Sequence, residues 1–244
     1  MLCHWRRSLV MTLNQARLHR LNDQPLVKDG QFVLYWMQAQ RRLSHNHSLD
    51  YAIKCANELG KPLVIYEGLR LDYPWASARL HQFILEGMRD NAAAAGKQGF
   101  TYWPFVETKK RPAKGLLARL AARAALVITD DFPCFIIPGQ SASLARWTDR
   151  AVIAVDSNSV VPLRLLGDAP YAAAHLRPKI HKQFAGAFEH RSAPKPKPPR
   201  ADGSKIIPGF DLAELDDLPR LIARLPVDQN VRPVDGRVGG SAAA

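Results

Sequence analysis

Short apolar runs alternate with amphipathic stretches along most of this chain. The apolar runs occupy residues 32–37, 63–66, 100–106, 125–129 and 151–155. Each run is too short for a core helix and has the length of a strand that is buried on both faces. Five strands separated by helical stretches predict a parallel sheet with helices on both faces, joined by right-handed crossovers.

The stretches between the apolar runs carry helical periodicity and recognisable end signals. Gly60 is expected to end the first helix and Gly96 the second, Ser141 is a candidate N-cap, and Pro178 should start or kink the last helix. The expected helices cover residues 45–59, 76–95, 115–123, 141–149 and 171–189. The predicted fold class is therefore α/β, a Rossmann-like doubly wound five-stranded parallel sheet, followed by a Pro-rich linker.

Composition shifts divide the chain into three parts. Residues 1–30 form a basic, weakly patterned arm, in which either Met1 or Met11 could be the true start. Residues 31–190 form the α/β domain. Residues 191–244 form the third part, in which four prolines are interleaved with lysines within 192–203 and a short amphipathic stretch follows at 212–225. The final Gly-Gly-Ser-Ala-Ala-Ala could begin a further helix or could fray, and the sequence leaves both readings open.

The net charge indicates the kind of binding partner, and the cysteine content indicates the cellular compartment. The net charge of +12 and the pI of about 9.9 favour a polyanion, nucleic acid first, although part of the surplus lies in the two ends. No apolar run approaches the ~20 residues that a membrane span needs. The three cysteines, Cys3, Cys55 and Cys134, are far apart and form no C-x-x-C. A reducing cytoplasm is therefore expected rather than a disulfide framework or a structural zinc site.

Familiar catalytic and nucleotide-binding motifs are absent from the sequence. No G-x-G-x-x-G follows the first strand, and no phosphate-binding G-x-x-x-x-G-K-[ST] occurs. No metal-binding histidine pair is present, because His45 and His47 do not share a helical face. Asp130 and Asp131 form an acid pair at a strand end, which could orient a ligand hydroxyl, bind a cation or, more simply, cap the next turn.

Several segments carry a resemblance to a known family. Residues 35–38 read Tyr-Trp-Met-Gln and residues 46–52 read Asn-His-Ser-Leu-Asp-Tyr-Ala. Further matching segments lie at residues 17–23, 57–64, 72–74, 83–88, 127–130, 155–162 and 176–181. In their order and spacing, these segments resemble the class II DNA photolyases. Two places depart from that pattern, namely residues 131–136, beside the expected ligand crevice, and residues 170–175.

The resemblance implies a light-dependent DNA-repair function for a longer protein. Photolyases split ultraviolet-induced pyrimidine dimers by electron transfer from FAD, and their N-terminal Rossmann-like domain can hold a deazaflavin or a folate as antenna chromophore. FAD and UV-damaged DNA bind to an all-helical domain. The resemblance thus implies an N-terminal light-harvesting domain whose catalytic half lies in a missing or partner helical domain, with no catalytic residue here. The chain is expected to be a monomer that contacts no membrane. The alternative is a stand-alone nucleotide- or flavin-binding module without repair activity.

The candidate chromophore-binding residues follow from the rule that open α/β sheets bind ligands at the carboxyl ends of their strands. Tyr66 and Phe132 would stack on a planar ring, and Gln38 and Asn158 would meet its polar edge. For each candidate, core packing or loop capping is the alternative role. The full set of candidates is Met37, Gln38, Tyr66, Glu67, Asp130, Phe132 and Asn158.

Overall fold

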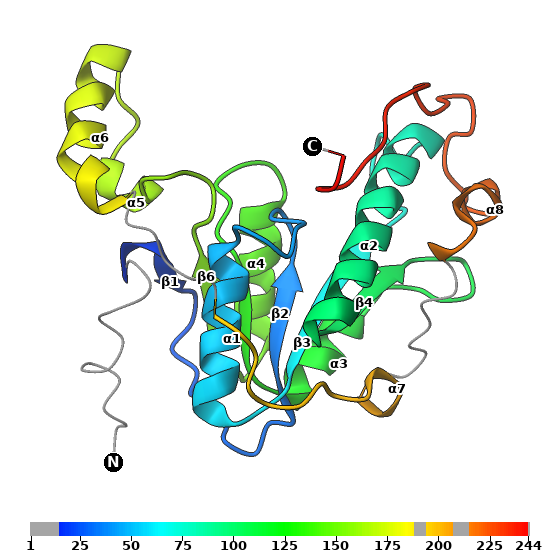
Figure 1. Ribbon diagram of the computed structural model, residues 1–244, viewed down its shortest axis with the longest axis horizontal. Coiled ribbons are helices and arrows are strands. Elements are labelled where there is room, and N and C mark those ends of the chain that lie inside the picture. The colour runs from blue at the N-terminus through cyan, green and yellow to red at the C-terminus, as the bar shows by residue number, and fades with distance from the viewer. Residues whose placement is uncertain (1–14, 188–193, 207–214, 244) are drawn as a thin grey trace.

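The computed structural model describes residues 15–187, 194–206 and 215–243 (Figure 1). Several features named from the sequence fall outside these ranges, namely Cys3, both candidate start residues and positions 191–193 of the linker. The predicted stretch 212–225 is described only from Leu215 onward.

The strands form one sheet in the order β1-β6-β5-β2-β3-β4. The five predicted strands are present, and all of them pair in parallel. Since β2 lies in the middle and the chain winds outward from it in both directions, the sheet is doubly wound, as predicted. The bounds of the five predicted strands are Phe32–Met37 for β2, Leu63–Leu69 for β3, Thr101–Val106 for β4, Ala124–Asp130 for β5 and Val152–Val155 for β6.

A sixth strand was not expected from the sequence. β1 (Leu18–Arg20) pairs antiparallel with β6 at the edge of the sheet, so part of the expected basic arm belongs to the sheet. A short 3-10 turn, η1 (Gln15–Arg17), leads into it. Arg17 anchors this edge, because its buried guanidinium donates hydrogen bonds to the carbonyls of Asp156, Ser159 and Val160 at 3.0, 3.0 and 2.5 Å.

The helices mostly occupy the predicted stretches, with differences at their ends. Gly60 ends α1 in the left-handed conformation, as predicted. Gly96 does not end α2, which continues until Gly99 adopts the left-handed conformation. Ser141 is a buried residue inside α4 and not its N-cap. The bounds are His47–Leu59 for α1, Ala78–Gln98 for α2, Leu116–Arg123 for α3, Ile137–Trp147 for α4, Leu163–Leu166 for α5, Ala173–Ala187 for α6, Gly203–Ile206 for α7 and Leu218–Ala223 for α8.

Pro178 lies inside α6, so the helix begins before it and not at it. α6 projects beyond the sheet next to α5 (Figure 1), and none of its described side chains is buried. The helix contributes little to the core that positions the other elements.

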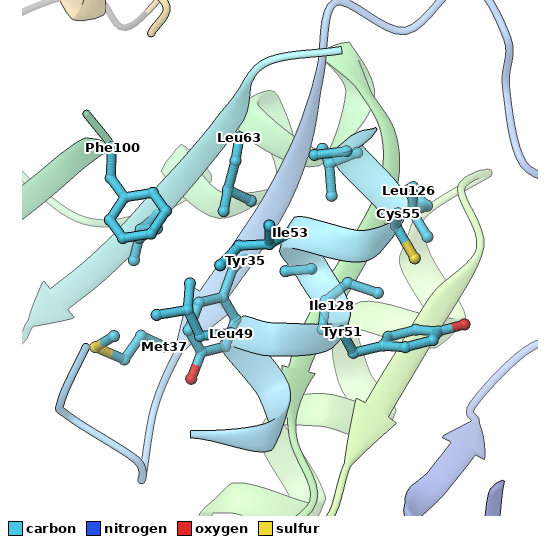
Figure 2. Close-up of a cluster of buried hydrophobic side chains, with 14 of the residues drawn as sticks. Tyr35, Met37, Leu49, Tyr51, Ile53, Cys55, Leu63, Phe100, Leu126 and Ile128 are labelled. Carbon is cyan, nitrogen blue, oxygen red and sulfur yellow. The ribbon is translucent and has the colours of Figure 1, made fainter. Parts of the chain in front are cut away.

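Side chains alternate between the two faces of the central strand β2. Val33, Tyr35 and Met37 join the apolar cluster beneath α1, whereas Phe32 and Leu34 join the cluster beneath α3 and α4. Figure 2 shows the first cluster, in which residues of α1 pack among those of the strands. Because both faces are covered by helices, the parallel strands read as mainly apolar runs, with Glu67 in β3 and Asp130 at the end of β5 as buried exceptions.

A third apolar cluster lies at the far edge, between α2 and the C-terminal part of the chain. Leu85 and Met88 of α2 pack there against Leu218, Leu221 and Ile222 of α8. Residues 215–243 therefore fold back onto the α/β domain along α2 (Figure 1).

A close backbone approach at Gly30 gives a test of this packing. A Cβ at position 30 would lie 2.2 Å from the nitrogen of Ala125 in β5, so Gly30→Ala must push the chain away from the sheet. We expect the free energy of unfolding to fall by about 1–3 kcal/mol or more, the usual cost of overpacking.

Urea unfolding measures this difference, with Gly139→Ala as the matched control. A Cβ at position 139, within α4, meets nothing within 4 Å. Equal stability of the two variants would show that the 27–31 turn does not pack against β5 as described.

Candidate functional site

A pocket of about 830 Å³ opens at the carboxyl ends of β2 and β3. Its floor includes Met37 and Gln38 at the end of β2 and Gly68 in β3, and Leu80 and Ile84 of α2 form one wall. The opposite wall comes from the first turns of α3 and from α4. This position, outside the carboxyl ends of parallel strands, is where doubly wound sheets bind their ligands.

Aromatic side chains line the pocket from several elements. Trp36 comes from β2, Tyr66 from β3, Tyr73 from the connection to α2, and Trp147 from the end of α4. Trp147 is 80% exposed, so it contributes little to the core and leaves its ring available to a ligand. Aromatic rings around an apolar cavity suit a flat conjugated ligand, which they can stack against.

Three of the candidates proposed from the sequence, Met37, Gln38 and Tyr66, line this pocket. Tyr66 is buried and packs its ring against Trp103, with centroids 5.6 Å apart. Burial raises the pKa of the Tyr66 phenol well above its ordinary value, so the side chain stays neutral.

Gln38 ties the end of β2 to the elements beside it. Its amide nitrogen donates to Thr129 Oγ1 at 2.8 Å and to Ser141 Oγ at 3.0 Å. The hydroxyl of Thr129 donates its only hydrogen to the carbonyl of Trp36, so its oxygen must accept from Gln38. The atom of Gln38 that faces Thr129 is therefore the amide nitrogen and not the amide oxygen. The side chain of Gln38 thus joins β5 to α4 behind the pocket wall.

Asp130 and Glu67 do not line the pocket; both are buried carboxylates that hold its frame. Asp130 Oδ2 accepts hydrogen bonds from the backbone nitrogens of Gln38, Ala39 and Gln40 at 2.9, 2.8 and 3.0 Å. Its other oxygen accepts from the hydroxyl of Tyr35 at 2.8 Å. Asp130 therefore holds the loop after β2, and its role as a ligand contact stays a prediction.

Glu67 holds a charged side chain of the pocket in place. It accepts from the hydroxyl of Tyr102 at 2.7 Å and from the amide of Asn91 at 3.2 Å, and it pairs with Arg41 at 3.5 Å. Burial raises the pKa of Glu67, and the positive charge of Arg41 opposes that rise. Arg41 in turn lines the pocket and donates to the carbonyl of Gln38 at 3.1 Å.

Phe132 and Asn158 lie at the ends of β5 and β6 and are not among the lining residues of this pocket. Asn158 donates to the carbonyl of Asp131 at 2.6 Å and to a carboxylate oxygen of Asp156 at 2.9 Å, and it accepts from Gln40 at 3.3 Å. These contacts use its side chain to hold loops together. The two residues stay predictions as ligand contacts.

Arg41, Tyr73 and Trp147 line the pocket but were not proposed from the sequence. Arg41 follows β2 closely and could have been included by the strand-end rule. Trp147 carried a weaker signal, since a tryptophan at the end of an amphipathic helix usually packs inward. Its exposure became evident only from the structure.

Two other classes of site find no support in the part of the chain that the structure describes. Within residues 15–187, 194–206 and 215–243, no cluster of three or more histidine, cysteine or acidic side chains is arranged to hold a metal ion. Over the same ranges, no helix has the length and apolar character to cross a membrane.

The Arg41–Glu67 pair predicts a pH-dependent stability. A carboxyl whose pKa is raised in the folded state stabilises the fold least when it is ionised, so stability falls as the pH rises through that pKa. Arg41→Gln removes the compensating charge and raises the pKa of Glu67 further. We therefore expect the variant to lose more stability than the unmodified protein between about pH 4 and neutrality.

Urea unfolding at a series of pH values measures this slope, and Arg42→Gln is the control. The guanidinium of Arg42 donates to the carbonyl of His45 at the surface and has no contact with Glu67 among the described interactions. Parallel stability profiles for Arg41→Gln and Arg42→Gln would contradict the coupling between Arg41 and Glu67.

Comparison with known proteins supplies the family. No family model matches the chain. A deoxyribodipyrimidine photo-lyase of Methanothermobacter thermautotrophicus is 34% identical over 180 residues, which cover 70% of this chain and 38% of the relative. A deoxyribodipyrimidine photo-lyase of Arabidopsis thaliana is 26% identical over 162 residues, covering 65% of this chain and 32% of the relative.

The chain thus spans about a third of the length of the curated relatives that it matches. Their similarity extends over about two thirds of the chain, and the segments quoted from the sequence point to the same proteins. The chain belongs to the photolyase family.

Proposed function

We propose that this chain is the N-terminal light-harvesting domain of a class II-like deoxyribodipyrimidine photolyase. The observation that carries the proposal is the aromatic-lined pocket at the carboxyl ends of β2 and β3, in a chain related to photolyases. The pocket would hold an antenna chromophore, a deazaflavin or a folate. Its volume of about 830 Å³ falls within the ~300–1,000 Å³ range typical of small-molecule sites.

The walls of the pocket suit a flat conjugated ring system. Trp36 and Trp147 offer aromatic faces, and Leu80, Ile84 and Leu117 supply apolar contact. Such walls offer stacking and apolar contact to a chromophore, and the lining also carries the charged side chains of Arg41, Arg70, Asp72, Glu107 and Lys114. The two carboxylates closest to the strand ends are engaged in holding backbone and side chains.

The repair chemistry would belong to a helical domain outside this chain. In that proposal, FAD and UV-damaged DNA bind to the helical domain, and the light absorbed in the α/β domain is passed to the flavin. Among the described residues after 190, the helices are α7 and α8, which have four and six residues. Neither could enclose a flavin. We place the protein in the cytoplasm, because its three scattered cysteines suit a reducing compartment.

The second candidate function is a stand-alone nucleotide- or flavin-binding module without repair activity. The doubly wound sheet and its pocket would serve such a module equally well. A preference for a plain mononucleotide over deazaflavin and folate would favour it. The absence of a glycine-rich phosphate loop in the sequence favours the chromophore instead.

Trp147→Leu tests the pocket directly. The variant removes an exposed ring that lines the pocket, so it should weaken 5-deazariboflavin or tetrahydrofolate binding by about tenfold, the effect of losing roughly 1.4 kcal/mol. The affinity is measured by fluorescence titration.

Trp75→Leu is the matched control, because Trp75 is 78% exposed and does not line the pocket. Equal losses in both variants would show that the ligand does not bind between the pocket walls. Failure of the unmodified chain to bind either ligand at high micromolar concentration would rule out the antenna proposal.

A repair assay tests the division of labour between the two domains. We expect the purified chain, supplied with FAD and blue light, to leave cyclobutane dimers in an oligonucleotide intact, since FAD has no proposed site here. Dimer loss is measured by chromatography against an irradiated blank. Light-dependent conversion of dimers to monomers by the chain alone would contradict the proposal.

A further inference from the structure

The first turn of α2 is capped by a distant part of the chain. The backbone nitrogens of Ala78 and Arg79 donate to the carbonyls of Asp228 and Val231 at 2.9 and 3.0 Å. Asp228 donates back to the carbonyl of Ala76 at 3.0 Å. The first backbone nitrogens of a helix have no acceptor within the helix. Here residues 226–243, which we call the C-terminal segment, supply the acceptors for two of these nitrogens.

A second attachment lies about two turns further along α2. The backbone nitrogen of Gly239 donates to the buried carboxylate of Glu86 at 2.6 Å. The two backbones touch at this point, because a Cβ at position 239 would lie 1.9 Å from the carbonyl oxygen of Phe83. Only glycine allows the C-terminal segment to approach α2 this closely.

Helix α2 connects the C-terminal segment to the pocket. Ile84 of α2 packs in the same apolar cluster as Val227 of the C-terminal segment, and Ile84 also lines the pocket. Leu80, one turn before Ile84, also lines the pocket. A shift of α2 relative to the sheet would therefore move one wall of the pocket.

We propose that the C-terminal segment controls the ligand affinity of the pocket by setting the position of α2. Glu86 and Gly239 are the positioning residues of this contact, and neither lines the pocket. The inference rests on the proposed chromophore-binding function and adds its regulation. Any partner or neighbouring domain that displaces residues 226–243 from α2 would shift the pocket wall and weaken ligand binding. A bound chromophore would in return stabilise the attachment of the C-terminal segment to α2. Such coupling is reciprocal, because each site changes the affinity of the other by the same factor.

The test compares Gly239→Ala with Gly96→Ala. Gly239→Ala introduces a methyl group against the backbone of Phe83 in α2. Gly96→Ala introduces a methyl group on α2 itself, at a position where a Cβ meets nothing within 4 Å. We expect Gly239→Ala to weaken 5-deazariboflavin binding by at least about fivefold, the lower range of measured couplings, and Gly96→Ala to leave it unchanged. Glu86→Ala removes the acceptor without a steric clash and should act in the same direction as Gly239→Ala.

Hydrogen exchange supplies a readout that is independent of affinity. In the unmodified chain, saturating 5-deazariboflavin should slow exchange of the Ala78, Arg79 and Gly239 amides, because a ligand that needs the attached segment also stabilises its attachment. Unchanged affinity in Gly239→Ala, together with faster exchange at Ala78 and Arg79, would overturn the inference, since the segment would then move without affecting the pocket.

The failure of the proposed function gives a different pattern. If the unmodified chain binds neither 5-deazariboflavin nor tetrahydrofolate, both the antenna proposal and its regulation are wrong. If the unmodified chain binds a chromophore and Gly239→Ala and Glu86→Ala bind it equally well, the antenna proposal stands and only the control by the C-terminal segment is wrong.

Discussion

The carboxylate of Asp130, buried at the end of β5, organises the edge of the sheet where the pocket lies. One of its oxygens collects three successive backbone nitrogens of the loop after β2, and the other binds the hydroxyl of Tyr35. The same hydroxyl accepts a hydrogen bond from Asn46, whose side-chain oxygen caps the start of α1. A single buried charge thus connects β5, the loop after β2 and the first helix. Four donors converging on one carboxylate compensate for the loss of its hydration, which would otherwise be costly.

This arrangement determines what the pocket can offer to a ligand. Because the loop at residues 38–40 is held to Asp130, Arg41 emerges at a fixed point and meets Glu67 beneath the pocket. Both buried acids are used to build the frame. What remains at the surface of the pocket is mainly aromatic and aliphatic, with Trp36, Trp147 and Ile84 among its walls. A pocket of this kind can hold a flat ligand against its apolar walls, with the charged side chains of Asp72, Glu107 and Lys114 also in its lining.

Much of the fold could be predicted from the sequence, because strands buried on both faces leave a clear signal. β2 occupies residues 32–37, as its apolar run indicated, and Gly60 ends α1 as expected. Prediction from the sequence failed where an element is held in place by residues far away in the chain. β1 has three residues and is held by Arg17, which binds carbonyls about 140 residues away. No periodicity can reveal a strand of that length.

The candidate site was predicted only in part, for a related physical reason. The strand-end rule pointed to Gln38 and Tyr66 because it depends on topology, which the sequence reveals well. The rule could not show that Asp130 binds backbone nitrogens or that Glu67 binds the side chains of Tyr102 and Asn91, contacts that depend on the folded structure. It also could not show that α4 begins four residues before Ser141, which brings Ile137 and Gln140 to the pocket wall.

The account depends above all on a chromophore binding between α2, α4 and the ends of β2 and β3. A crystal structure of the chain grown with saturating 5-deazariboflavin tests that claim most directly. The account predicts density for a flat ring beside Trp36, Tyr66 and Trp147. Density elsewhere, such as beside Phe132 and Asn158 at the ends of β5 and β6, would contradict the assignment of this pocket, as would an empty pocket at saturating ligand.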